Sequence, residues 1–374
     1  EEYQEEKFEK VNKDLTDTHW FTSKTMAFMM PTIMMIMNGL SLAIYWIGAV
    51  LINDAQDIQG KFSLFSDMVV FSSYAMQVVM SFMMLVMIFI MLPRASVAAK
   101  RILEVLDTEP SIEDGTRDTF PVMKDGEVEF KDVSFKYPDA EEYVLEHISF
   151  SAKKGETIAF IGATGCGKST AINLIPRFYD ATEGEVFVDG VNVKEYTQEA
   201  LHNKIGYVSQ KAILFSGTIA DNVAYGENGK APATQDDIAM AVKVAQASEF
   251  VEKKDQGYDG YVAQGGSNFS GGQKQRLSIA RAIARQPEIL IFDDSFSALD
   301  YKTDRILREA LRKECKDATK IIVAQRIGTI RDADKIIVLD DGQIVGMGTH
   351  DELMKNCEVY QEIAYSQLSK EELA

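Results

Sequence analysis

Cysteine, histidine and net positive charge are all scarce in this sequence. Among its 374 residues are 3 cysteines and 4 histidines. Cys166, Cys315 and Cys357 are odd in number and show no paired spacing, which argues against a disulfide framework and fits a reducing compartment. The histidines lack metal-ligand spacing, so we predict no protein-bound zinc. The net charge of -18 argues against a nucleic-acid-binding protein, which needs a basic face to offset phosphate charge.

The start of the chain has neither an initiator methionine nor a signal-peptide pattern. It opens on Glu1, so we expect the sequence to begin inside a longer protein. Residues 1–23 are rich in charge, with Phe8, Val11 and Leu15 at helical spacing. This pattern predicts an amphipathic helix that leads into the segment that follows.

Charge is absent from two long runs. Residues 26–52 form one run of 27 residues and residues 68–92 a second run of 25. A helix needs roughly 20 apolar residues to cross a bilayer core, so each run is long enough to span it. Both runs are apolar on every side, which argues against the alternative of a buried helix in a soluble core. We predict transmembrane helices at about residues 24–53 and 65–93.

Basic residues flank the outer ends of this pair of runs. They are Lys24, Arg94, Lys100 and Arg101, whereas the connecting segment (residues 53–67) carries only Lys61. The positive-inside rule then places both outer ends in the cytoplasm and the connection outside. Everything after Arg94 is therefore expected to be cytoplasmic.

Methionine is concentrated in the two runs, which hold 13 of the 17 methionines. These flexible side chains indicate either an adaptable surface that binds substrate or a surface that is simply compatible with lipid, and the sequence does not decide between the two. Pro31, Asn38 and Gly39 are expected to interrupt the first span and to face other helices or a cavity. Two helices cannot enclose a pathway, so further helices must come from a preceding segment, a partner, or both.

Composition changes sharply after the second span. The helix is expected to continue to Pro110, and residues 109–125 read as a linker rich in acidic residues, Thr, Gly and Pro. We assign residues 1–108 to a partial transmembrane domain and residues 126–374 to a separate domain that opens with an alternating strand.

A phosphate-binding loop stands near the start of this second domain. The buried strand predicted at residues 156–161 is followed by GATGCGKST and then a helical run. Glycines in this order turn backbone N–H groups toward phosphate oxygens, Lys168 reaches the β- and γ-phosphates, and the Ser169 hydroxyl ligates Mg²⁺. The predicted nucleotide-binding residues of this loop are Gly162, Thr164, Gly165, Cys166, Gly167, Lys168, Ser169 and Thr170.

A second apolar strand, Ile289–Phe292, ends at Asp293. Taken with the phosphate loop, this carboxylate is the expected Mg²⁺ anchor.

Between these two segments lies NFSGGQKQRLSIARAI, and here the sequence resembles an ATP-binding cassette (ABC) transporter. The family's signature is matched at Ser270, Gly271, Gly272 and Gln273, with Phe269 in place of the commoner Leu. The resemblance implies that this segment opens a helix whose N-terminus caps the γ-phosphate of ATP held by a second subunit.

The resemblance extends along the chain in the family's order. It implies that Tyr137 stacks on adenine and that Gln210 contacts Mg²⁺ and water. It also implies that Ser297–Asp300 cross the dimer interface and that Gln325, which ends the strand predicted at IIVAQ, takes the place of the switch histidine. The N-terminal stretch is similar to the last third of a six-helix exporter half, beginning before its fifth helix.

Two residues depart from the family pattern. Asp294 stands where hydrolysing members usually carry Glu, and Gln325 stands where they carry His. Asp is shorter by one methylene, and a shift of ~1 Å in a positioned reaction costs on the order of 100-fold in rate. An amide cannot carry the charge of an imidazole. Asp294, Gln325 and Gln210 are the expected catalytic residues of a site that resembles the degenerate site of heterodimeric exporters, the alternative being a weak but self-sufficient site.

The expected fold is an all-α membrane segment with exporter-like (type IV) helices, followed by an α/β P-loop ABC ATPase domain. The expected function is ATP-driven export at the plasma membrane of a drug-like, lipid or peptide substrate, with ATP and Mg²⁺ as cofactors. The resemblance implies a second half-transporter as partner, contact with membrane lipid and no nucleic acid. The alternatives are a slow homodimeric exporter, an ATP-gated channel or regulatory subunit and, against the two predicted spans, a soluble ATPase.

Overall fold

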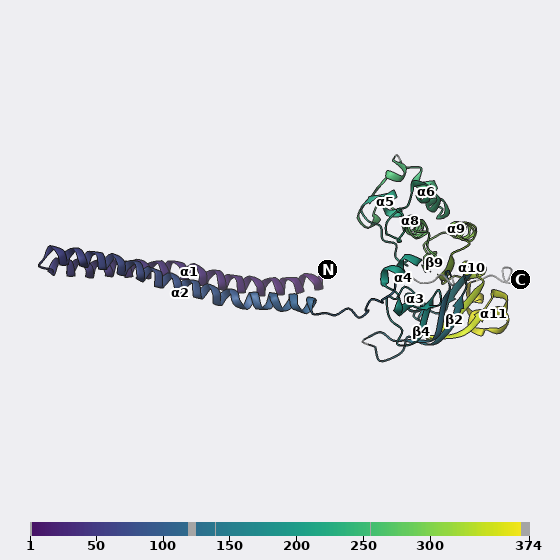
Figure 1. Cartoon of the computed structure of the whole chain (residues 1–374), viewed down its shortest axis with the longest axis horizontal. Helices are drawn as coiled ribbons and strands as arrows, with labels where there is room; N and C mark the ends of the chain where they lie inside the picture. Colours follow the sequence, from purple (N-terminus) through teal and green to yellow (C-terminus); the bar gives the residue numbers. More distant parts are fainter. Residues whose placement is uncertain (1, 119–124, 139, 255, 368–374) are drawn as a thin grey trace. The chain divides into compact units, whose positions relative to one another are not determined.

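The structure is a computed structural model that describes residues 2–118, 125–138, 140–254 and 256–367 (Figure 1). The chain divides into two compact units, Glu1–Pro110 and Ser111–Ala374. The division falls inside the predicted linker, of which residues 119–124 lie outside the described residues.

Two long helices make up the first unit. Helix α1 (Glu2–Asp54) and helix α2 (Ile58–Leu106) run side by side in opposite directions (Figure 1). Each contains a stretch long and apolar enough to cross a membrane. The connection was expected to span residues 53–67, but it is a turn of residues 55–57 only. Asp57 explains the early restart, because its Oδ2 accepts a hydrogen bond of 2.9 Å from the Gly60 N–H and caps α2.

Helical bounds differ from expectation at two further places. Helix α1 continues unbroken through Pro31, where an interruption was expected. A proline removes one backbone donor, and long apolar helices tolerate that loss. Helix α2 ends at Leu106 instead of at Pro110. Proline disfavours helical geometry in the residue before it, so the helix stops short of it.

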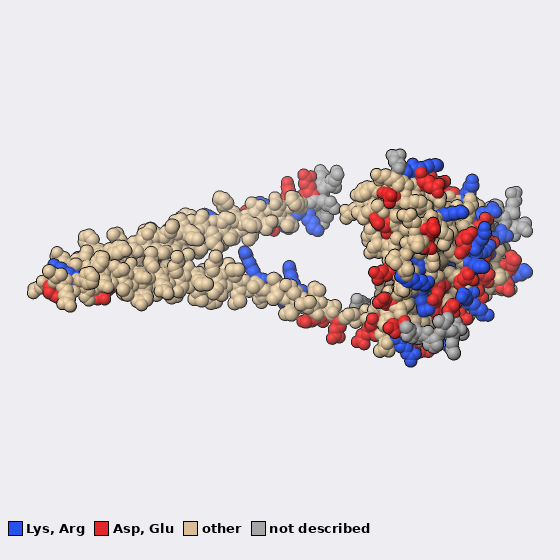
Figure 2. All heavy atoms as spheres, turned by 45° about the horizontal axis from the view of Figure 1, so that its top comes forward, with Lys and Arg blue, Asp and Glu red and all other residues tan. Residues whose placement is uncertain are grey.

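An apolar cavity of about 460 Å³ lies between α1 and α2. Five methionines from both helices contribute to its wall, namely Met26, Met29, Met30, Met83 and Met87. Figure 2 shows the charged side chains of this unit gathered toward the ends of the hairpin, with uncharged surface between them. Among the described residues that line this groove, several carry sulfur and none carries a charge.

In the described residues of the second unit, three sheets form the framework. A six-stranded sheet has the order β12-β11-β3-β10-β9-β6, a four-stranded antiparallel sheet has the order β2-β1-β4-β5, and β7 pairs with β8. The strands are β1 (Val128–Phe135), β2 (Leu145–Ala152), β3 (Thr157–Ile161), β4 (Glu183–Val188), β5 (Val191–Asn192), β6 (Ile205–Val208), β7 (Gly217–Thr218), β8 (Tyr261–Val262), β9 (Ile289–Asp293), β10 (Thr319–Val323), β11 (Lys335–Asp340) and β12 (Gln343–Gly348).

Helices cover this framework. They are α3 (Lys168–Asn173), α4 (Gln198–Lys204), α5 (Ile219–Val223), α6 (Gln235–Val244), α7 (Ser248–Val251), α8 (Gly271–Ala284), α9 (Tyr301–Glu314), α10 (Ile327–Ile330), α11 (His350–Asn356) and α12 (Glu358–Gln367). The predicted strands at residues 126–135, 156–161 and 289–292 correspond to β1, β3 and β9, and the predicted helix after the signature is α8. The predicted order of a helical region followed by an α/β domain is confirmed.

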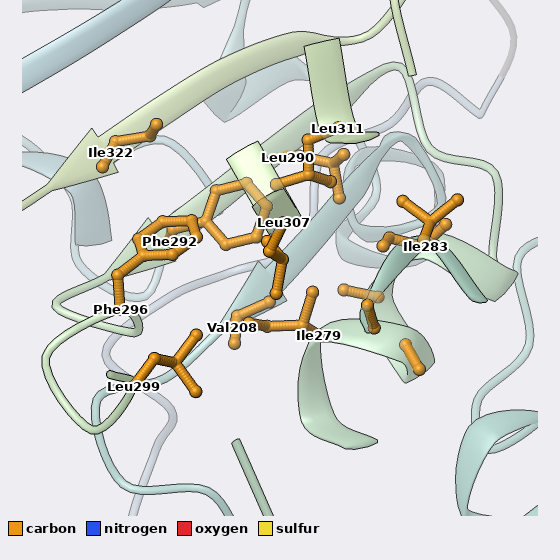
Figure 3. Close-up of a cluster of buried hydrophobic side chains, with 14 of the residues drawn as sticks. Val208, Ile279, Ile283, Leu290, Phe292, Phe296, Leu299, Leu307, Leu311 and Ile322 are labelled. Atoms are coloured by element: carbon orange, nitrogen blue, oxygen red, sulfur yellow. The ribbon is translucent and has the colours of Figure 1, made fainter. Parts of the chain in front are cut away.

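The six-stranded sheet separates two hydrophobic cores. On β3, Ile158 and Phe160 join the core shared with the antiparallel sheet, whereas Ala159 and Ile161 join the core under α8 and α9. Figure 3 shows part of the second core, where Phe292 from β9, Leu307 from α9 and Ile279 from α8 converge. Strand residues alternate between faces, and both faces of β3 and β9 are buried, which is why the residues Ile158–Ile161 and Ile289–Phe292 are all apolar.

Candidate active site

The predicted site residues gather at one edge of the six-stranded sheet. Strands β6, β9, β10 and β3 are mutually parallel, and Val323 of β10 lies level with both Phe160 of β3 and Asp293 of β9. The carboxyl ends of parallel strands share an edge, so the segments that follow these four strands meet there. This edge brings together the phosphate loop, Asp293, Asp294 and Gln325 from segments far apart in the sequence.

The phosphate loop folds tightly between β3 and α3. Gly162 has φ 153°, and a Cβ at this position would collide with the Leu339 carbonyl oxygen. Gly167, which precedes α3, has φ 96°, and a Cβ there would stand 2.6 Å from Leu145 Cδ2. Both positions therefore require glycine. Thr164 and Gly165 are exposed at the tip of the loop, whereas Cys166 and Thr170 are buried.

Lys168 turns back over this loop. Its ammonium donates hydrogen bonds to the carbonyl oxygens of Gly162 (2.9 Å) and Ala163 (2.6 Å), and it lies 3.5 Å from Cys166 Sγ. The residue is only 8% exposed. A positive charge is thus held inside the hollow of the loop, where an anionic phosphate would compete with the two carbonyls for its protons.

Ser169 and Asp293 form the first pair of side chains across the site. The Ser169 hydroxyl donates a hydrogen bond of 2.7 Å to Asp293 Oδ1. Tyr207, which was not predicted, donates from its hydroxyl to Asn173 Oδ1 (2.9 Å) and to Asp293 Oδ2 (3.3 Å). Burial raises the pKa of Tyr207, and the Asp293 carboxylate adds to the rise, so the phenol stays a donor. A hydroxyl beside an oriented carboxylate is a hard-oxygen donor set that fits Mg²⁺.

Asp294 occupies the centre of the edge in an unusual conformation. Its φ is 45°, in the left-handed region, and its N–H donates to the Val323 carbonyl at 3.0 Å. Aspartate is one of the few residues that adopt this region at tolerable cost, and such backbone outliers concentrate at functional sites. The residue is 7% exposed.

Two glutamine amides converge on a single oxygen of Asp294. Asp294 Oδ2 accepts from Gln325 Nε2 at 2.9 Å and from Gln210 Nε2 at 3.2 Å. Burial raises the pKa of the Asp294 carboxyl, the Gln210 hydrogen bond opposes that rise, and the Asp293 charge adds to it. Gln210 is thus directed at Asp294, and its contact with Mg²⁺ stays a prediction.

The sequence predicted that Gln325 ends a strand, and this prediction is wrong. Strand β10 ends at Val323, and Gln325 lies two residues beyond it. Its carbonyl accepts a hydrogen bond of 2.8 Å from Gln367 Nε2 at the end of α12. Gln367 is 42 residues away in sequence, and no local pattern points to this contact.

Tyr137 stands beside the start of α3. Its hydroxyl lies within hydrogen-bond distance of Thr170 Oγ1 (3.1 Å), and its ring packs edge-on against Phe135 and Tyr179. An aromatic face is therefore fixed next to the phosphate loop, with Tyr179 as a neighbour that the sequence did not indicate. This position suits a planar base attached to the bound phosphates.

The signature residues lie at the start of α8. Ser270 and Gln273 form a reciprocal capping box, with hydrogen bonds of 3.3 Å and 3.0 Å between each side chain and the other's N–H. Among the described residues, no atom beyond the adjacent residues and the backbone of α8 itself lies within 4 Å of the place a Gly271 Cβ would take, so this turn is open on that side. Within the described part of the second unit, no hydrogen bond joins residues 270–273 to the phosphate loop, and Figure 1 shows α8 well separated from α3.

Comparison with known proteins places this site in context. Residues 145–297 match the ABC transporter family. The chain is 43% identical over 368 residues to an uncharacterized ABC transporter ATP-binding protein of Mycobacterium tuberculosis, covering 98% of this chain and 62% of that protein. It is 44% identical over 262 residues to a putative multidrug export ATP-binding/permease protein of Staphylococcus aureus, covering 70% of this chain and 45% of that protein.

A solved structure is similar in fold. A bacterial Atm1-family ABC exporter with ATP bound superposes with a TM-score of 0.75 at 31% identity, over 90% of this chain and 58% of that chain. The Mycobacterium tuberculosis protein and the Atm1-family exporter match nearly all of this chain. The chain spans about three fifths of the length of each.

Proposed function

We propose that this chain is a subunit of an ATP-driven exporter that binds ATP and Mg²⁺ at its phosphate loop. It carries an ABC transporter ATP-binding domain, preceded by a helical region long enough to span a membrane. The observation that carries the proposal is the meeting of Lys168, the Ser169–Asp293 pair and Asp294 at one sheet edge. Helices and ATPase are fused in one chain. That organisation, together with the export function in the name of the Staphylococcus aureus relative, supports export.

Nucleotide binding follows from the groups described. Lys168 and the N–H groups of the loop hold the β- and γ-phosphates, and Tyr137 holds the base by stacking. Ser169 and Asp293 hold Mg²⁺, which when bound neutralises phosphate charge. Tyr207 keeps the Asp293 carboxylate oriented through its hydrogen bond of 3.3 Å.

Hydrolysis at this site is slow in our proposal. The attacking water needs a carboxylate oxygen as proton acceptor, placed within about 3 Å of it. Asp294 is one methylene shorter than Glu, and its Oδ2 is already bonded to Gln210 and Gln325. Gln325 donates its amide to Asp294 and to the γ-phosphate but cannot exchange a proton at neutral pH. The site therefore retains ATP more readily than it hydrolyses it.

A partner subunit completes both sites. The open turn at Gly271, at the start of α8, offers backbone N–H groups to the ATP held by the partner, and the partner's signature completes the site of this chain. We propose a heterodimer in which the partner's site hydrolyses ATP. The complex lies in the plasma membrane with its ATPase domains in the cytoplasm. Its substrate is a drug-like, lipid or peptide molecule that contacts the methionine-lined groove.

The deciding experiment compares ATP turnover by the purified full-length protein alone with turnover by the co-expressed pair. We expect slow turnover alone, fast turnover in the pair, and substrate movement into vesicles that requires hydrolysis. Brisk turnover by the protein alone that persists in Asp294→Asn would refute the heterodimer. Nucleotide binding without hydrolysis-dependent transport would instead support an ATP-gated channel.

A further inference from the structure

The last residue of helix α12 holds the segment that carries Gln325. Gln367 Nε2 donates to the Gln325 carbonyl at 2.8 Å, and Gln367 Oε1 accepts from the Ile327 N–H at 2.9 Å. One side-chain amide thus makes two backbone hydrogen bonds that bracket Arg326. Both distances are those of well-formed hydrogen bonds, and the planar amide fixes the separation of the two backbone groups it binds.

The bracketed segment needs such a partner. Strand β10 ends at Val323 and helix α10 begins at Ile327, with Arg326 at the N-cap position. The Arg326 side chain makes no capping hydrogen bond, and arginine has no acceptor with which to make one. The first N–H groups of a helix lack partners within it, so Gln367 supplies from α12 the acceptor that a local cap would otherwise supply.

The side chains of the same segment point to the site. Gln325 Nε2 donates to Asp294 Oδ2 at 2.9 Å. Arg326 reaches the carbonyl oxygens of Ser297 and Leu299 at 3.3 Å and 3.4 Å. Gln367 is therefore one residue removed from the carboxylate at the centre of the site: it holds the backbone of Gln325, and the side chain of Gln325 holds Asp294.

Helix α12 is firmly anchored on the face that carries Gln367. Tyr360 and Ala364 are fully buried, and with Gln367 they fall at i, i+4 and i+7, which is one face of a helix. The Tyr360 hydroxyl lies 2.8 Å from His350 Nδ1 of α11. Gln367 is thus presented to Gln325 from an element packed into the core rather than from a loose tail.

We propose that Gln367 is a positioning residue, through which helix α12 sets Gln325 and thereby the ability of the site to distinguish ATP from ADP. This rests on the proposed function, in which Gln325 contacts the γ-phosphate. A backbone held at the Gln325 carbonyl and at the Ile327 N–H keeps the Gln325 side-chain amide at the place where it donates to Asp294 and to the phosphate. A freed backbone lets the amide move away, and the contribution of the γ-phosphate to binding falls, whereas the α- and β-phosphates remain held by the loop.

Equilibrium binding to the full-length protein tests this, with Mg²⁺–ADP compared with the Mg²⁺ complex of a non-hydrolysable ATP analogue. In Gln367→Ala we expect the preference for the triphosphate to fall about five- to tenfold, the usual size of a lost hydrogen bond or two, with ADP affinity unchanged. Gln367→Glu keeps the acceptor for Ile327 but loses the donor to Gln325, and we expect a similar fall. In a Gln325→Ala background, Gln367→Ala should add nothing.

Gln361 provides the matched control. It lies on the same helix, and its amide donates to the Met354 carbonyl at 3.0 Å, away from the site. Gln361→Ala should leave the triphosphate preference unchanged. An unchanged preference in both Gln367 variants, or an equal loss in Gln361→Ala, would overturn the inference while leaving the proposed ATP site intact. A wild-type protein that binds neither nucleotide would overturn the proposed function and the inference with it.

Discussion

The side-chain amide of Gln325 donates a hydrogen bond of 2.9 Å to Asp294 Oδ2. These are the two residues at which the sequence departs from the pattern of efficient ABC ATPases, and they are partners. The departures are therefore one structural change rather than two. The Gln325 amide donates to the shorter carboxylate, and the function proposed above has this pair take little part in proton transfer.

Restoring both members of this pair is predicted to raise turnover. Asp294→Glu extends the carboxylate by one methylene, and Gln325→His replaces the amide by a ring that carries charge. We expect the double variant to hydrolyse ATP about 10- to 100-fold faster at this site than the native pair, and more than either single variant gives. Phosphate release measured with the partner's site disabled checks this. Unchanged turnover in a double variant that still binds ATP would contradict the proposed role of the pair.

Removal of the Tyr207 hydroxyl is predicted to weaken metal binding selectively. Tyr207→Phe deletes the hydroxyl that donates to Asn173 Oδ1 and to Asp293 Oδ2, and it leaves the ring packed against Phe178. Loss of the contact with Asp293, at about 1 kcal/mol, corresponds to a roughly three- to tenfold higher Mg²⁺ concentration for half-maximal ATP binding. Titration of Mg²⁺ at fixed ATP measures it. Tyr225→Phe, at a residue 53% exposed, is the control and should not shift the curve.

Acidification is predicted to destabilise the fold through His350. Burial lowers the pKa of His350 below 6.5, and the Arg331 charge lowers it further, against smaller opposing effects of Asp351 and Asp332. The folded state then binds fewer protons than the unfolded chain, so stability falls as pH drops below 6.5 toward the folded pKa. His350→Gln removes this dependence. Urea unfolding at pH 7.5 and pH 5.5 should show a smaller loss of stability in the variant; equal losses would contradict the assignment.

Truncation of Leu307 is predicted to cost stability rather than nucleotide affinity. Leu307 of α9 is fully buried beside Phe292 and Ile279 (Figure 3). Leu307→Ala should lower the free energy of unfolding by about 2 to 5 kcal/mol, because it removes buried methyl groups and leaves a cavity. Its neighbour Ile306 is 40% exposed, and Ile306→Ala should cost much less. Urea denaturation followed by circular dichroism measures both.

The sequence predicted those parts of the site that follow from local pattern. The glycine loop after β3, Asp293 at the end of β9 and the capped start of α8 at Ser270 each combine an apolar run with a characteristic polar residue. In the structure the glycine loop and Asp293 meet at one sheet edge, because the parallel strands β3 and β9 align their carboxyl ends, whereas the start of α8 lies away from it.

Contacts made across the fold were not predictable in this way. Tyr207 is an ordinary strand residue until β6 is laid beside β9, where its hydroxyl meets Asp293. Gln367 acquires its role only because α12 docks next to α10. The predicted helix bounds were wrong for a similar reason. Asp57 caps α2 and shortens the turn, and Pro31 is accommodated within α1. Both depend on local helix geometry, which composition does not reveal.

Successive side chains of β3 enter two different hydrophobic cores, and this affects how the sequence of the domain can change during evolution. Ile158 and Ala159 are neighbours in the chain, but they belong to opposite sides of a shared wall. Side chains on one side do not contact those on the other, so a substitution in one core and a substitution in the other, at positions far enough apart to share no partner, should combine additively. Each of the two cores can therefore change in sequence separately during evolution, while the backbone of the six-stranded sheet keeps the phosphate loop after β3 in place.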